Sequence, residues 1–87
     1  MAEIRFPSLL AQWAGGIRRW EGDGTTVEDL IAHVDRQFPG FRERLCDGNR
    51  LRPIYKLVVD GRIAFGGLET PIGPDSVVDI LPSFGGG

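Results

Sequence analysis

The side chains that most often carry out catalysis are scarce in this chain. It has one cysteine, Cys46, one histidine, His33, and one lysine, Lys56. A single cysteine cannot form a disulfide within the chain or a metal site of paired cysteines. One histidine and one cysteine also leave few ways to build a nucleophile–base pair. The remaining group of interest is the carboxylate of Gly87, which closes a run of three glycines.

Neither His33 nor Cys46 sits in a pattern that favours catalysis. His33 falls on the outer face of a predicted helix, one turn after Asp29, where a solvated ion pair is expected. Cys46 follows Leu45 at the edge of a loop and is expected to be a packed thiol. We therefore expect no catalytic side chain, no bound metal and no bound cofactor.

Length and composition indicate one globular domain without a membrane segment. The chain has 87 residues, of which 41% are hydrophobic and 25% are charged, as is usual for a soluble domain. No apolar run approaches about 18 residues, and the first residues do not resemble a secretory signal. We expect a cytoplasmic protein that is a monomer when free and binds no membrane.

The charge of the chain argues against a nucleic-acid partner. The net charge is −2, and phosphate binding depends on clustered basic side chains. The nine arginines are scattered, with Arg18 and Arg19 forming one of the denser groups. This group has two interpretations, a solvated surface or a contact with an acidic protein partner.

The first 24 residues predict two strands joined by a long loop. Ile4 to Leu10 begins with alternating apolar and polar residues, and Ile17 to Glu21 is a second candidate strand. Gly15 and Gly16 supply a turn between them, because glycine adopts positive φ without a steric cost.

A helix follows, with an apolar face that comprises Val27, Leu30, Ile31, Val34 and Phe38. Thr25 and Glu28 fit a capping box at its start. Pro39 and Gly40 end it, because proline cannot continue the hydrogen-bond ladder.

The second half of the chain predicts three strands. Phe41 to Cys46 suits a short helical turn, and residues 47–49 are expected to form a loop. Tyr55 to Val59 is a strand that turns at Asp60-Gly61 into a short return strand, Arg62 to Phe65. Ser76 to Leu81 is the last strand.

The order of elements predicts an α+β fold. We expect a mixed sheet of four to five strands with one main helix packed across one face. The first and last strands should lie side by side at its centre. Residues 1–82 should form the domain and residues 83–87 a flexible tail.

Three stretches of the sequence carry a family resemblance: Pro7-x-Leu9 through Gly15-Gly16; Phe65-Gly66-Gly67-Leu68-x-Thr70-x-Ile72; and Val78-x-Ile80-Leu81-Pro82 before the glycines. On these the chain resembles the MoaD/ThiS family of sulfur carriers, which have the β-grasp (ubiquitin-like) fold, and its CysO branch in particular. It departs from that family by ending in three glycines instead of two, and by having Ser83-Phe84 before them.

The resemblance implies that the protein is a co-substrate and not an enzyme. An ATP-dependent activating enzyme would adenylate the Gly87 carboxylate. A sulfurtransferase or another sulfide source would then replace AMP and leave a thiocarboxylate. That sulfur would go to a biosynthetic enzyme that makes cysteine, molybdopterin, thiazole or another sulfur-containing metabolite. Gly85 and Gly86 would let the tail enter a narrow passage, because they lack side chains.

A partner surface is expected on the sheet face away from the helix. Val58, Val77 and Leu81 should point to that face, and exposed apolar side chains gathered there would mark a protein interface. Partial burial by loops is the alternative explanation. Phe65 and Phe84 are further candidate partner contacts.

Two other functions remain open. The chain could be a protein modifier that is joined through Gly87 to lysines of its targets. It could also be a β-grasp binding domain with an inert tail. Deleting Gly86 and Gly87 would leave that last function intact.

Overall fold

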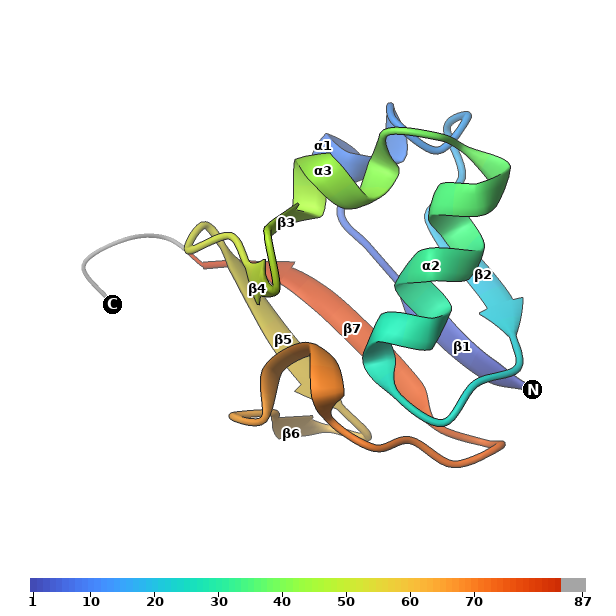
Figure 1. The fold of residues 1–87 in the computed structure, drawn as a ribbon, viewed down its shortest axis with the longest axis vertical. Coiled ribbons are helices and arrows are strands. Elements are labelled where there is room, and N and C mark those ends of the chain that lie inside the picture. The colour runs from blue at the N-terminus through green and yellow to red at the C-terminus, as the bar shows by residue number, and fades with distance from the viewer. Residues whose placement is uncertain (84–87) are drawn as a thin grey trace.

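A computed structural model describes residues 1–83, so Phe84 and the three terminal glycines lie outside the described residues. Its centre is a mixed sheet with the strand order β2-β1-β7-β5-β6 (Figure 1). The strands are β1 (Ala2–Arg5), β2 (Arg19–Gly22), β5 (Tyr55–Val59), β6 (Arg62–Ile63) and β7 (Val77–Pro82). β1 and β7 pair in parallel, and the other neighbours pair antiparallel. The expected α+β fold, with the first and last strands adjacent, is confirmed.

Helix α2 (Val27–Gln37) lies across one face of this sheet (Figure 1). Four members of its predicted apolar stripe are buried: Val27, Leu30, Ile31 and Val34. The fifth, Phe38, is the C-cap after the helix ends at Gln37, and it is half-buried. The predicted capping box is wrong by one residue, because the N-cap is Thr26. The Asp29 amide donates to the Thr26 hydroxyl at 3.3 Å, and the Asp29 carboxylate accepts from the Thr26 amide at 3.0 Å. Glu28 instead binds Arg42 of the next helix.

The first hairpin also differs from the prediction. β1 ends at Arg5, and a short helix, α1 (Ser8–Ala11), follows Pro7. Sequence analysis missed this helix because four residues are too few to show a helical period. Gly15 and Gly16 make the expected turn with φ values of 62° and 88°. The second strand begins two residues later than predicted, at Arg19.

The segment between α2 and β5 holds more structure than predicted. Helix α3 (Phe41–Leu45) is the expected short turn. It leads into a two-stranded ribbon of β3 (Cys46–Asp47) and β4 (Arg50–Leu51), so residues 47–49 contribute to a tight reversal and not to an open loop. The Asp60-Gly61 turn is confirmed, with both φ angles positive. A 3₁₀-helix, η1 (Gly67–Glu69), follows β6.

The core lies between α2 and the sheet. Alternate residues of the central strands point into it, including Ile4, Leu57, Val78 and Ile80, each at most 4% exposed. The residues between them point to the opposite face, which no helix covers within residues 1–83 (Figure 1). No helix in the described chain has the length and apolar character needed to cross a membrane.

Candidate functional site at the end of strand β7

Strand β7 carries the chain to its C-terminal end through the middle of the sheet. Val78 and Ile80 are buried; both pair with β5, and Val78 also pairs with Ile4 of β1. The pairing extends to Pro82, and the Ser83 amide then donates to the Ile54 carbonyl at 2.7 Å. The chain is therefore anchored up to Ser83. The predicted reacting residue, Gly87, follows four positions later, outside the described residues.

The open face of the sheet brings together three of the predicted partner residues. Val58, Val77 and Leu81 occupy the alternate positions of β5 and β7 that face away from α2. Leu81 is 41% exposed, and the two valines are half-buried. Ile63 of β6 lies opposite Val58 and is 53% exposed, so it extends the same apolar area. Sequence analysis did not include Ile63, although it lies in the return strand predicted for Arg62 to Phe65, of which the structure forms only Arg62–Ile63.

Phe65 lies apart from these residues. It is 93% exposed and lines a separate cavity of about 600 Å³ between η1 and β4, together with Leu51 and Leu68. The chain turns into η1 immediately after Phe65, which removes its side chain from the regular alternation of the sheet. The predicted contact Phe84 lies outside the described residues.

A band of charged residues crosses the open face beside the apolar area. Arg5 forms ion pairs with Glu3 and with Asp79, and Arg19 forms ion pairs with Glu3 and Glu21. The hydrogen bond from Arg5 lowers the pKa of Glu3. Sequence analysis missed this band. Its signal was present, because charges occupy alternate positions of both N-terminal strands.

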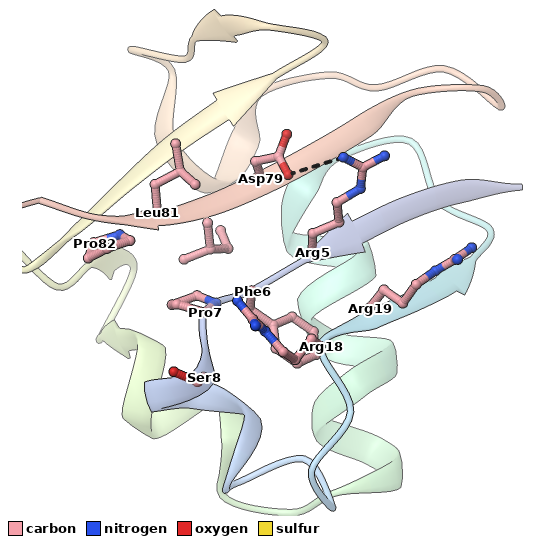
Figure 2. Close-up of a pocket in the computed structure, with 10 residues that line it drawn as sticks. Arg5, Phe6, Pro7, Ser8, Arg18, Arg19, Asp79, Leu81 and Pro82 are labelled. Atoms are coloured by element: carbon pink, nitrogen blue, oxygen red, sulfur yellow. Dashed lines mark ion pairs between the residues drawn. The ribbon is translucent and has the colours of Figure 1, made fainter.

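A groove of about 560 Å³ lies at the junction of this charged band with the end of β7 (Figure 2). Arg5, Arg18 and Arg19 line one side of it. Leu81 and Pro82, the last described residues before Ser83, line the other side. The groove is therefore next to the last described residues, five positions or fewer before Gly87.

The remaining reactive side chains lie outside this region. Cys46 is 3% exposed, and burial raises the pKa of its thiol to about 11, so little nucleophilic thiolate forms at neutral pH. His33 is half-buried on α2. The ion pair expected between His33 and Asp29 does not form, because Asp29 closes the capping box. Within residues 1–83, no three acidic, histidine or cysteine side chains are grouped to hold a metal ion.

Comparison with known proteins shows to which family this chain belongs. The model of the ThiS family matches residues 4–87. The chain belongs to the ThiS family. As a ThiS-family protein it is a sulfur carrier, a class of small proteins that are not themselves catalysts.

Similar proteins agree with this family over the whole chain. The sulfur carrier protein CysO of Mycobacterium tuberculosis is 32% identical over 89 residues, which covers 97% of this chain and 96% of the relative. A chain in the crystal structure of the Amycolatopsis orientalis BexX/CysO complex is 27% identical, with full coverage of both chains and a TM-score of 0.88. The crystal structure of M. tuberculosis CysO is 26% identical, covers 97% and 100% of the two chains, and has a TM-score of 0.85. The predicted resemblance to the CysO branch is confirmed.

Proposed function

We propose that a partner enzyme activates the Gly87 carboxylate with ATP and that a sulfur donor then converts it to a thiocarboxylate. Membership of the ThiS family supports a sulfur-carrying role. The observation that carries the proposal is the position of β7. This strand and the hydrogen bond from the Ser83 amide to the Ile54 carbonyl hold the chain at the centre of the sheet up to Ser83, four residues before Gly87.

The chemistry requires two steps. In the first, a Gly87 carboxylate oxygen attacks the α-phosphorus of ATP, the bond to the β-phosphate breaks, and pyrophosphate leaves. In the second, the sulfur of a hydrosulfide ion attacks the acyl carbon, and the bond to AMP breaks. With hydrosulfide the products are the thiocarboxylate, AMP and one proton. ATP is bound by the activating enzyme, so the carrier itself needs no cofactor, acid or base.

Covalent geometry limits how far the reacting group can extend from the domain. Four residues beyond Ser83 span at most about 14 Å at ~3.3–3.6 Å per residue. The activating enzyme must therefore contact the end of the domain while it holds the Gly87 carboxylate. Gly85 and Gly86 suit a narrow passage, because backbone without Cβ atoms needs the least width.

We place this contact on the open face of the sheet, at Val58, Val77 and Leu81. An exposed apolar area that includes Leu81, six residues before Gly87, is suited to partner binding. Phe65 offers a second apolar contact on a different side of the domain. A CysO chain of A. orientalis forms a complex with BexX, which supports protein partners for this chain too. We also propose a cytoplasmic location, because the reaction consumes ATP and reduced sulfur.

Intact mass spectrometry tests the proposed function. Each ubiquitin-activating-like enzyme of the source organism is incubated in turn with the full chain, ATP and sodium sulfide. Conversion of the carboxylate to a thiocarboxylate adds about 16 Da. We expect this shift with one of the enzymes and none without ATP. The chain that lacks Gly86 and Gly87 should remain unmodified. Absence of the shift with every enzyme would refute the proposal, and lysine-linked adducts would favour the protein-modifier alternative.

A further inference from the structure

Arg18 is the one arginine of the groove whose charge is not neutralised by a neighbour within residues 1–83. Arg5 is occupied by Glu3 and Asp79, and Arg19 by Glu3 and Glu21. The Arg18 side chain is exposed and forms no ion pair with any carboxylate of the described chain.

The backbone holds Arg18 at the groove. Its carbonyl accepts a hydrogen bond of 3.0 Å from the Phe6 amide, which continues the pairing of β1 and β2 past Arg5 and Arg19. The backbone of Arg18 is therefore fixed by a hydrogen bond that extends the sheet, so the residue does not lie on a free loop. Figure 2 shows Arg5 directed toward Asp79 and Arg19 directed away from it.

The other side of the groove is apolar. Pro7, Leu81 and Pro82 line it, and Leu81 and Pro82 are exposed. A ligand that fits this groove must combine a carboxylate for the Arg18 guanidinium with an apolar group for Leu81 and Pro82. An acidic peptide segment with a neighbouring aliphatic or aromatic side chain has this chemistry, and arginine binds carboxylates in a bidentate manner.

The groove is lined by Pro82, which precedes Ser83, and Gly87 follows Ser83 by four residues. Any enzyme that holds the Gly87 carboxylate must approach this end of the domain, because the intervening residues reach only about 14 Å. We propose that the groove receives an acidic–apolar segment of the activating enzyme, with its carboxylate on Arg18. This inference rests on the proposed function and identifies the chemistry of the partner at that site.

The loading reaction with ATP and sulfide tests the inference through the KM for the carrier. Arg18→Glu should raise KM about tenfold and leave kcat unchanged, because it replaces an attraction with a repulsion in binding only. Arg18→Gln should fall between this variant and the wild type. Arg62→Glu is the matched control, because Arg62 is also exposed, also forms no ion pair within residues 1–83, and lies on β6 away from the groove.

Salt supplies an independent measurement. Raising the ionic strength from about 0.05 to 0.5 M should increase the wild-type KM more than the Arg18→Gln KM, because added ions screen an exposed ion pair. Urea unfolding of each variant should match the wild type, which separates binding from folding.

The outcomes are distinguishable. If the wild type is loaded and both Arg18 variants keep its KM, the groove inference fails and the proposed function stands. If Arg62→Glu raises KM as much as Arg18→Glu, the rise in KM comes from the changed net charge of the carrier and not from the groove, and the inference also fails. A dimer of the chain that dissociates on Arg18→Glu would assign the groove to a second copy and overturn the inference. If the wild type is never loaded, the proposed function itself fails.

Discussion

Replacing Leu81 with alanine separates docking on the open face from folding. Full burial of a leucine side chain stabilises by about 1.5–3 kcal/mol. Leu81 is 41% exposed in the free domain, so docking can gain the corresponding fraction, roughly 0.6–1.2 kcal/mol. That free energy equals about a three- to sevenfold change in affinity. The remainder of the side chain is already buried, so Leu81→Ala should also lower the free energy of unfolding by about 1–2 kcal/mol.

Two assays report these effects separately. Release of pyrophosphate during adenylation, measured at several carrier concentrations, gives the KM and kcat of the activating enzyme. We expect a three- to sevenfold higher KM and an unchanged kcat, as befits about 1 kcal/mol of lost binding. Urea unfolding of the free domain gives its stability.

The matched control is Leu9→Ala. Leu9 is 54% exposed, belongs to α1 and not to a strand of the sheet, and does not line the groove. It should lower stability to a similar or smaller degree and leave KM unchanged. The reasoning is refuted if Leu81→Ala is destabilised as expected but keeps the wild-type KM, because the enzyme would then dock elsewhere.

Three further predictions concern other sites. Thr26→Ala should lower the free energy of unfolding by about 1 kcal/mol in urea, and Thr25→Ala by less, because Thr26 is the N-cap; equal losses would contradict the cap assignment. Because burial raises the pKa of Cys46 to about 11, the folded chain keeps this proton longer than the unfolded chain. The difference in the free energy of unfolding between the wild type and Cys46→Ala should therefore be constant below about pH 8.5. Above that pH the wild type should lose stability relative to the variant as the pH rises toward 11, and a pH-independent difference would argue against the raised pKa. Phe65→Ala should leave urea stability within about 0.5 kcal/mol of the wild type, since Phe65 is 93% exposed, but raise the KM for loading or for sulfur delivery; no change in either KM would remove Phe65 from the interfaces.

Local sequence patterns were sufficient for the main elements of this protein. The apolar spacing from Val27 to Val34 determined α2, because a 3.6-residue period aligns these side chains on one face. The alternation at Val78 and Ile80 determined which side of β7 is buried. Asp60-Gly61 determined the tight hairpin, because both residues need positive φ and glycine and aspartate tolerate it. These features depend on residues that are close in sequence.

Features that depend on distant residues were decided only by the tertiary structure. Thr25 and Thr26 are both followed three residues later by an acid; the sequence analysis chose Thr25, whereas the N-cap is Thr26. The choice follows from Arg42, which lies 14 residues from Glu28 and binds its carboxylate, while Asp29 closes the cap.

The candidate site shows the same division. The terminal glycines and the apolar residues Val77 and Leu81 could be selected from the sequence. The pairing of Arg5 with Asp79 required the parallel register of β1 and β7, which brings together residues from opposite ends of the chain. In that register Asp79 pairs with Arg5, and the pairing of β1 with both β2 and β7 places Arg18 at the groove beside the end of β7.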